Sequence, residues 1–275
     1  MPIPFAVRPA PDVLPFFKAL ADETRLSILR LLALTDLKSG EIMEQLRVPQ
    51  NAVSYHLKHL RALGLLRDRR STADARDVYY SLDLDRLQAL YTAAGDALHV
   101  EAAHPDADAD DAGPTTDTDR PLRVLFLCTH NSARSQLAEG IMRYLGGEGV
   151  EVHSAGSAPT AVHPDALALL AEWGIDTTRH TSKSLDPFAG QAFDYIITVC
   201  DRVRDQCPVF ADDPVRIHWS FPDPALIADD EERRRAFCTV RRELMTRILY
   251  LLNVPHPATG RRLAIRSLVR AGDAS

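Results

Sequence analysis

The chain has 275 residues, of which 45% are hydrophobic and 25% are charged, a composition that excludes a fibrous or wholly disordered protein. No segment approaches the roughly 18 consecutive apolar residues of a membrane span, and the N-terminus lacks the basic region and apolar run of a secretory signal. Four cysteines are too few for a disulfide scaffold of this length. We therefore expect a cytoplasmic protein of about two domains with no membrane partner.

Charge divides the chain into unequal parts. The net charge is −6, and residues 101–120 alone carry seven acidic side chains against one arginine. Because this segment repels itself and has no apolar face, we expect an acidic flexible linker, in preference to an acidic decoy for a DNA-binding surface. Domains are then expected at residues 1–100 and 121–252, with an unassigned basic tail at residues 253–275.

The first domain shows the apolar periodicity of several short helices. A tight Val-Pro-Gln turn separates the third helix from the fourth, which is the arrangement of a helix-turn-helix. Two short strands joined by a polar loop follow, as in a wing, and the last amphipathic helix suits dimer packing. Helices are predicted at residues 12–20, 22–34, 39–46, 51–63 and 84–98, and strands at residues 65–70 and 78–82.

Positive charge gathers on the fourth helix and the wing. Residues 47–76 hold seven lysines and arginines against two aspartates. Neutralisation of phosphates needs such a patch, so we expect contact with double-stranded DNA in preference to a merely solvated face. Ser54 and His56 are placed to reach base edges. The expected DNA-binding residues are Gln50, Asn51, Ser54, Tyr55, His56, Lys58, Arg67, Arg69, Arg70 and Arg76.

The strings K-A-L-A-D-E-T-R-L-S-I-L-R-L-L and A-V-S-Y-H-L-K-H-L-R-A-L-G-L-L resemble the ArsR-type winged-helix repressors. The resemblance implies a homodimer, formed through this domain, that binds operator DNA. Relatives sense arsenite through cysteines, but the first cysteine here is Cys128, so a thiolate arsenic site in this domain is excluded. Other relatives bind metal with Asp and His on the last helix. Asp83, His99 and His104 are sparse candidates for such ligands, and we expect no metal site.

The second domain alternates strands with helices, which predicts an α/β fold with a four-stranded parallel sheet. Its ligand site is expected at the carboxyl end of the first strand, where such sheets bind ligands. Strands are predicted at residues 123–127, 150–153, 193–199 and 215–219, and helices at residues 136–145, 165–173 and 231–252.

The first strand of this domain runs directly into C-T-H-N-S-A-R-S. A Cys-x5-Arg loop between a strand and a helix forms an oxyanion cradle, because backbone N–H groups and the helix N-terminus point into it. Arg134 adds a bidentate fork, and we expect the same field to lower the pKa of Cys128. Ser135 is placed to bond the thiolate and Asn131 to brace the loop. The expected oxyanion-loop residues are Thr129, His130, Asn131, Ser132, Ala133 and Ser135.

Two further cysteines point to redox chemistry. Cys200 and Cys207 are seven residues apart, which on a helix is two turns, or about 10.5 Å of rise. A disulfide needs Cα atoms within roughly 7 Å, so a bond between these two requires the segment to unwind. Free cysteines are often packed as small hydrophobes, but the oxyanion loop in the same domain favours a redox relay.

The second domain resembles the thioredoxin-coupled arsenate reductases, built on the low-molecular-weight tyrosine phosphatase fold. The shared motifs are C-T-H-N-S-A-R-S-Q-L-A-E-G, V-H-S-A-G, H-T-S-K, the cysteine pair and H-W-S-F-P-D-P. The resemblance implies that Cys128 attacks arsenate held by Arg134, with Asp223 as general acid. Cys200 then attacks Cys128 and releases arsenite, and Cys207 attacks Cys200. Thioredoxin reduces the resulting disulfide from outside, and no bound cofactor is expected.

Two of the positions that depart from the pattern of these relatives concern the charge around the loop. His130 stands where glycine is common, and we expect it to point to solvent in preference to acting as a proton donor. Some relatives bind potassium beside the loop through Asn, Glu, Ser and Asp. Asn131, Glu139 and Ser154 match, but Lys183 stands at the aspartate position. We expect its ammonium group to replace the cation.

Three alternatives stay open beside a fused repressor and arsenate reductase. A protein tyrosine phosphatase attached to a DNA-binding domain shares the loop and the acid, but it has no use for Cys207. Phosphatase relatives also usually have proline where Gln136 stands. A redox-sensing or oxyanion-sensing regulator turns over once only. A mycothiol or glutaredoxin reductant needs only one enzyme thiol in the relay, so the three cysteines oppose it.

Overall fold

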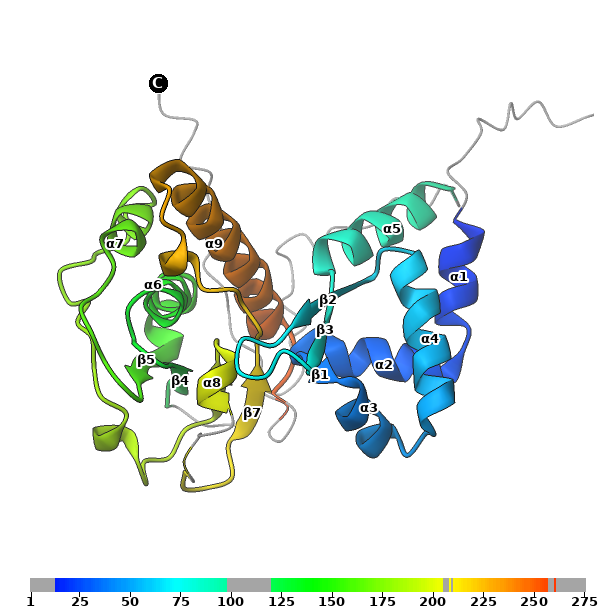
Figure 1. Ribbon diagram of the computed structural model, residues 1–275, viewed down its shortest axis with the longest axis horizontal. Helices are drawn as coiled ribbons and strands as arrows, with labels where there is room; N and C mark the ends of the chain where they lie inside the picture. Colours follow the sequence, from blue (N-terminus) through cyan, green and yellow to red (C-terminus); the bar gives the residue numbers. More distant parts are fainter. Residues whose placement is uncertain (1–12, 98–119, 205–207, 209, 257–259, 261–275) are drawn as a thin grey trace, which may run out of the picture. The chain divides into compact units, whose positions relative to one another are not determined.

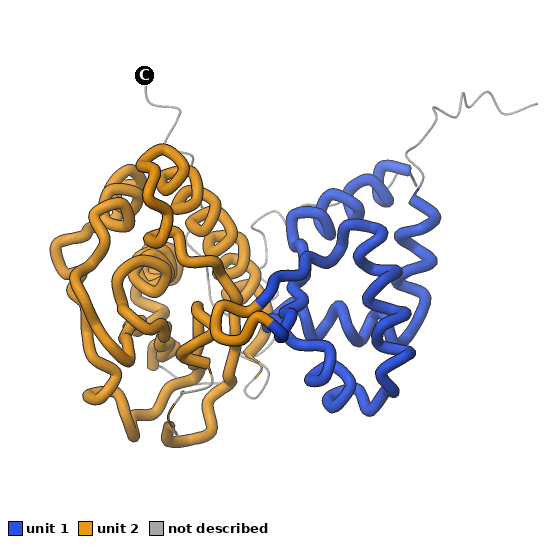
Figure 2. Tube along the Cα trace, in the orientation of Figure 1, with its two compact units in different colours: residues 1–70, 76–113 blue, residues 71–75, 114–275 orange. Residues whose placement is uncertain are grey.

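The computed structural model describes residues 13–97, 120–204, 208, 210–256 and 260. The chain forms two compact units, residues 1–70 with 76–113 and residues 71–75 with 114–275 (Figure 2). The predicted linker and basic tail lie mostly outside the described residues. Within the described ranges, no helix combines the length and the apolar character needed to cross a bilayer.

The first unit is mostly helical and carries a small antiparallel sheet of order β1-β3-β2 (Figure 1). The predicted helices and strands are confirmed to within two residues at their described ends, and β1 is an addition that the sequence did not predict. The helices are α1 (Leu14–Leu20), α2 (Glu23–Leu34), α3 (Ser39–Leu46), α4 (Gln50–Ala62) and α5 (Leu84–Ala97). The strands are β1 (Leu37–Lys38), β2 (Leu66–Arg70) and β3 (Val78–Leu82).

Local chemistry sets the boundaries of the helix-turn-helix. Asp22 caps α2, since its Oδ1 accepts a hydrogen bond from the Arg25 backbone N–H at 2.8 Å. Arg47 ends α3 in the left-handed region with φ 55°, directly before the Val-Pro turn. Val53 and Leu60 on α4 are completely buried in the core of this unit. The apolar stripe therefore fixes which face of α4 remains available for a partner.

The second unit is an α/β fold whose parallel four-stranded sheet has the order β5-β4-β6-β7, which confirms the predicted fold class (Figure 1). Helix α6 packs on β4 and β5 and also contacts α7 and α9. The strands are β4 (Leu122–Cys128), β5 (Val150–Gly156), β6 (Tyr195–Thr198) and β7 (Val215–His218). The helices are α6 (Arg134–Gly146), α7 (Pro164–Ala171), α8 (Asp201–Arg204) and α9 (Asp230–Asn253).

The central strand of this sheet places the candidate site. Residues 124–127 of β4 are completely buried, as their unbroken apolar run predicts for a strand covered on both faces. The strand ends at Cys128, which pairs in register with Gly156 on β5. The Cys-x5-Arg segment therefore begins at the carboxyl edge of the sheet and ends where α6 begins.

Candidate active site and DNA-binding surface

The loop between β4 and α6 wraps around the sulfur of Cys128. The Asn131 backbone N–H donates to Cys128 Sγ at 3.0 Å, and Asn131 itself has a left-handed φ of 46°. Gly156 lies directly against this turn: a Cβ there would be 2.7 Å from the Thr129 carbonyl oxygen and 2.9 Å from the Asn131 nitrogen. Any larger residue would push the loop outward, so the glycine allows the curvature that the thiol needs.

A hydrogen-bond network orients the hydroxyl next to the thiol. Asn131 Nδ2 donates to Ser135 Oγ at 3.0 Å and to Ser154 Oγ at 2.7 Å. Ser135 Oγ also lies 2.9 Å from Cys128 Sγ. Because Ser135 already accepts from the amide, its own proton is available to donate to the sulfur. Ser135 and Asn131 thus occupy the positions that the sequence predicts for them.

A second network, which the sequence did not predict, supports the loop from behind. Gln136 Nε2 donates to the Asn131 carbonyl and Oδ1 oxygens at 3.1 and 3.0 Å, and to the Thr181 carbonyl at 2.9 Å. Burial lowers the pKa of His180, so its ring is neutral near pH 7. His180 Nδ1 lies 2.8 Å from Gln136 Oε1, which can only accept, so this nitrogen carries the proton. The H-T-S-K motif, which contains His180 and Thr181, is the sequence feature that could have indicated this network.

Lys183 takes part in the same support. Its Nζ donates to Glu139 Oε2 at 3.1 Å and to the Thr181 carbonyl at 3.1 Å. Glu139 is buried, and its carboxylate also accepts from Ser154 and Arg143. Burial alone would raise the pKa of Glu139, but the nearby cations and the serine hydroxyl bring it below its ordinary value. The ammonium group therefore compensates a buried charge behind the loop.

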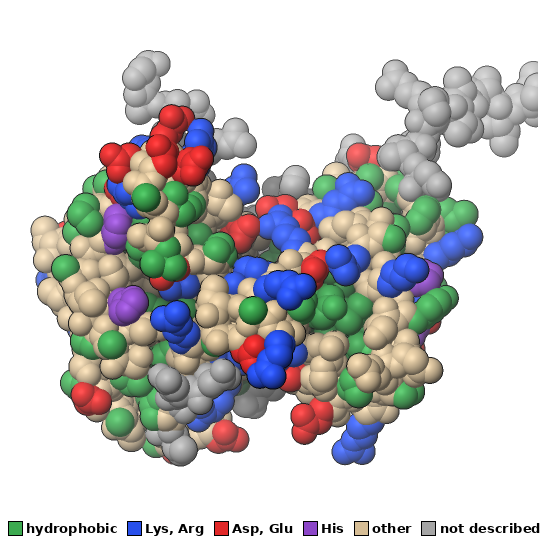
Figure 3. Space-filling view, viewed as in Figure 1, with side chains coloured by type: hydrophobic (Ala, Val, Ile, Leu, Met, Phe, Trp, Pro, Cys, Tyr) green, Lys and Arg blue, Asp and Glu red, His purple; other side chains and the backbone are tan. Residues whose placement is uncertain are grey.

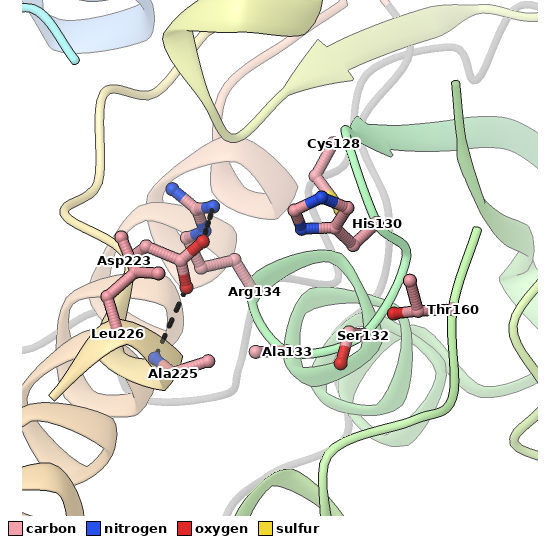
Figure 4. Close-up of a pocket in the computed structure, with 9 residues that line it drawn as sticks. All are labelled: Cys128, His130, Ser132, Ala133, Arg134, Thr160, Asp223, Ala225 and Leu226. Carbon is pink, nitrogen blue, oxygen red and sulfur yellow. Dashed lines mark hydrogen bonds and ion pairs between the residues drawn. The ribbon is translucent and has the colours of Figure 1, made fainter. Parts of the chain in front are cut away.

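The pocket in front of the loop has a volume of about 190 Å³, which is room for a tetrahedral oxyanion (Figure 4). Arg134, at the start of α6, donates from Nη2 to Asp223 Oδ2 at 2.5 Å and from Nη1 to the Phe221 carbonyl at 2.9 Å. Asp223 Oδ1 accepts from the Ala225 backbone N–H at 3.2 Å. The arginine fork is thus held toward the pocket by protein acceptors. The lining residues are Cys128, His130, Ser132, Ala133, Arg134, Thr160, Asp223, Ala225 and Leu226.

The prediction that the loop lowers the pKa of Cys128 is wrong. Burial raises the pKa of this thiol, and the neighbouring Cys200 raises it further. Ser135, Arg134 and the Asn131 N–H act in the opposite direction without overcoming burial. The physical reason is visible in the geometry, since the thiol is only 3% exposed and the charge of Arg134 is shared with a carboxylate.

The second cysteine of the predicted relay lies beside the loop. Cys200 is buried, and its Sγ is 3.4 Å from Thr129 Oγ1, the hydroxyl that follows Cys128 in the chain. Cys200 directly precedes α8, whose described extent is Asp201–Arg204. Cys207 lies outside the described residues, so its place two helical turns away stays a prediction.

Most of the predicted DNA-binding side chains lie on one face of α4 and on the wing, which consists of β2, β3 and the loop that joins them. Figure 3 shows lysine and arginine side chains of this unit in blue. His56 corrects the prediction, because its side chain is only 13% exposed and its Nδ1 lies 3.7 Å from Asp22 Oδ1 at the start of α2. Arg69 is half-buried. The exposed members are Gln50, Asn51, Ser54, Tyr55, Lys58, Arg67, Arg70 and Arg76.

The weak metal candidates are not brought together. Asp83 caps α5 by accepting from the Arg86 backbone N–H at 2.9 Å, and it pairs with Arg67 at 2.7 Å. His99 and His104 lie outside the described residues. Across the part of the chain that the structure describes, no three His, Cys, Asp or Glu side chains are grouped to hold a metal ion.

Comparison with known proteins identifies both units. Residues 123–253 match the family of low molecular weight phosphotyrosine protein phosphatases, and residues 22–68 match the bacterial regulatory proteins of the arsR family. An arsenate reductase of Halalkalibacterium halodurans is 42% identical over 127 residues, which cover 46% of this chain and 91% of that protein. The chain belongs to the arsenate reductase family. It joins an ArsR-family helix-turn-helix to an arsenate reductase domain of the low molecular weight phosphatase fold.

Other relatives carry the same name. The arsenate reductase of Bacillus subtilis is 37% identical over 126 residues, which cover 46% of this chain and 91% of that protein. A solved structure of a thioredoxin-dependent arsenate reductase from Corynebacterium glutamicum is 24% identical and covers 82% of this chain and 94% of that chain, with a TM-score of 0.39. The arsenate reductase domain here contains the loop, the arginine, and Cys128 and Cys200 within the matched residues.

Proposed function

We propose that the arsenate reductase domain converts arsenate to arsenite by a relay of Cys128, Cys200 and Cys207, and that thioredoxin recycles it. One arrangement carries this proposal. A cysteine at the base of an oxyanion-sized pocket has Arg134 beside it, and Cys200 Sγ lies 3.4 Å from the hydroxyl of Thr129, the next residue of the loop. A nucleophile, an oxyanion ligand and a second thiol thus meet at one edge of the sheet.

In the first step arsenate binds in the pocket and takes over N–H donors that Arg134 otherwise directs to the Phe221 carbonyl and to Asp223. The thiol proton of Cys128 passes to an oxygen of the bound dianion, and Sγ attacks arsenic. An arsenic–sulfur bond forms, an arsenic–oxygen bond breaks, and the oxygen leaves as water, with Asp223 passing to it the proton that the dianion took from Cys128. Ser135 stabilises the sulfur through its hydroxyl, which lies 2.9 Å away.

In the second step Cys200 attacks Cys128 Sγ. A disulfide forms, the arsenic–sulfur bond breaks, and its electron pair remains on arsenic, which leaves as arsenite. Cys207 then attacks Cys200, restores the Cys128 thiol and leaves a Cys200–Cys207 disulfide. Thioredoxin supplies the two electrons and two protons that reduce this bond, so the cycle uses no bound cofactor.

The ArsR-family unit supports a second part of the proposal, a homodimer that binds operator DNA through α4 and the wing. The exposed side chains of Asn51, Ser54 and Tyr55 line the outer face of α4, while Arg70 and Arg76 flank the wing. A basic face next to an exposed helix supplies both backbone contacts and side chains for base readout.

Replacing Cys207 by serine tests the relay. Purified full-length protein is assayed with arsenate, thioredoxin, thioredoxin reductase and NADPH. We expect Cys207→Ser to abolish sustained NADPH oxidation while one equivalent of arsenite is still released per chain. Cys238→Ser, which removes a partly exposed thiol on α9, is the matched control and retains turnover.

Three other outcomes would overturn the relay. Equal turnover of Cys207→Ser and wild type, together with efficient hydrolysis of an aryl phosphate, favours the phosphatase. If wild-type protein releases arsenite once and thioredoxin does not reduce it again, the domain acts as a redox or oxyanion sensor. Recycling by a glutaredoxin or mycothiol system in place of thioredoxin identifies a different reductant.

A further inference from the structure

The substrate pocket is close to electrically neutral before an oxyanion binds. Arg134 and Asp223 carry opposite charges and are paired at 2.5 Å. The raised pKa of Cys128 keeps its thiol uncharged near neutral pH. Among the nine lining residues, His130 is the other side chain that can carry a positive charge. An arsenate dianion therefore meets one arginine whose charge is already partly used, and one histidine.

The backbone of His130 is fixed while its ring is left available. Its carbonyl oxygen accepts from the Thr160 backbone N–H at 3.0 Å and from Ser182 Oγ at 3.1 Å, so neighbouring segments hold the residue from two directions. The side chain is exposed and lines the pocket, on the Cys128 side in Figure 4, across from the Arg134–Asp223 pair. Within the described part of the chain, no hydrogen bond or ion pair engages the imidazole.

The other charged groups around this loop are occupied. Lys183, in the segment after α7, is bound to Glu139 behind the loop. His163 begins α7, and its Nδ1 accepts from the Asp165 backbone N–H at 3.2 Å. Neither lines the pocket. The titratable or charged side chains that line the pocket with His130 are Cys128 on β4, Arg134 on α6 and Asp223, which precedes residues 224–226.

We propose that His130 is a substrate-binding residue whose protonated ring supplies a second positive charge to the oxyanion. The inference rests on the proposed arsenate site and deepens it. Histidine changes charge between about pH 5 and 8, so the ring adds attraction at the acidic end of this range and none at the alkaline end. Arg134 and the loop N–H groups bind at every pH in the range. Oxyanion affinity therefore rises as the pH falls, in proportion to the imidazolium present.

Sulfate is the probe that isolates this effect. It has the tetrahedral shape of arsenate, is not reduced by thiols and remains a dianion across the range, whereas arsenate titrates itself. Its dissociation constant is measured on the full chain by calorimetry at about pH 5.5 and about pH 8. A full charge next to a largely solvated dianion strengthens binding by about tenfold, so wild type is expected to bind sulfate about tenfold more tightly at the lower pH.

Three variants assign the effect. His130→Gln keeps a polar side chain and is expected to reduce the pH dependence to less than about twofold. His130→Lys carries its charge across the range and is expected to bind tightly at both pH values. His163→Asn is the control, because asparagine keeps the acceptor that caps α7 while a neighbouring titratable ring is removed; it is expected to retain the wild-type dependence.

The possible failures are distinguishable. A His130→Gln protein that keeps the tenfold dependence overturns the role of His130 and leaves the arsenate site standing, since sulfate still binds. A wild type that binds sulfate equally at both pH values also overturns it. A wild type that binds no sulfate at either pH overturns the oxyanion site itself. Circular dichroism of each variant confirms that folding is retained.

Discussion

The hydroxyl of Ser135 is expected to decide how readily Cys128 ionises. Ser135 is completely buried, lies 2.9 Å from the sulfur and is oriented by Asn131 Nδ2 at 3.0 Å. A hydrogen bond to a charged group contributes about 1.5–3 kcal/mol, which corresponds to roughly a 10-fold to 150-fold change in an equilibrium or rate. Ser135→Ala removes this bond and leaves Asn131 its second acceptor, Ser154. The pKa of Cys128, already raised by burial, then rises further.

The assay is the pH dependence of Cys128 alkylation by iodoacetamide, followed by mass spectrometry of the labelled peptide. Ser135→Ala is expected to react roughly 10-fold or more slowly at neutral pH and to need more alkaline conditions for the same rate. Arsenate reduction in a single turnover is expected to slow in parallel. Ser157→Ala, which changes an exposed serine after β5, serves as the control. Overlapping alkylation profiles for Ser135→Ala and wild type would refute the assigned direction of the hydrogen bond.

Three further changes test the surroundings of the site and the DNA-binding unit. Gly156→Ala places a Cβ 2.7 Å from a loop carbonyl, and we expect it to lower the free energy of unfolding in a urea titration by about 1–3 kcal/mol. We expect reductase activity to fall as well. The control is Gly40→Ala, in open space on a helix, which is expected to be neutral or stabilising in the same titration. Lys183→Met leaves Glu139 buried with one cation fewer, so we expect the pKa of Glu139 to rise. The lowered pKa of Glu139 stabilises the fold above the pKa of the unfolded state, and this stabilisation is lost as the pH falls through the pKa of the folded state. In a series of thermal melts, the variant should lose this stability at a higher pH than wild type does. Lys58→Ala is expected to weaken operator binding uniformly across sequences and to reduce the salt slope by about one, so an unchanged slope in fluorescence anisotropy would contradict a phosphate contact.

The sequence predicted the fold because its signals are local. The apolar run of β4 and the periodicity of α2 are each readable from a few neighbouring residues, and both elements lie where they were expected. Strand β1 was missed because two residues are too few to show alternation. It exists because Leu37 and Lys38 pair with Tyr80 and Tyr79 in β3, which lies far along the chain.

The candidate site was predictable in its residues and less so in its electrostatics. A Cys-x5-Arg string places the cysteine and arginine at opposite ends of one loop, so their meeting follows from local geometry. The pKa of Cys128 depends on burial by the whole domain and on Cys200, which no local pattern conveys. The contact of Gln136 with His180 joins residues 44 positions apart, and the inward turn of His56 depends on α2. Long-range packing decided each of these features.

The buried setting of Cys128 also bears on how the protein withstands oxidants. Thiolates, and not thiols, react with peroxides and climb the ladder to irreversible sulfinic and sulfonic acids. A sulfur that is 3% exposed and protonated at neutral pH offers such oxidants little to attack between turnovers. In the proposed mechanism, a ligand that enters the pocket and accepts the proton makes this sulfur nucleophilic. We therefore expect peroxides to oxidise Cys128 slowly until a ligand takes its proton.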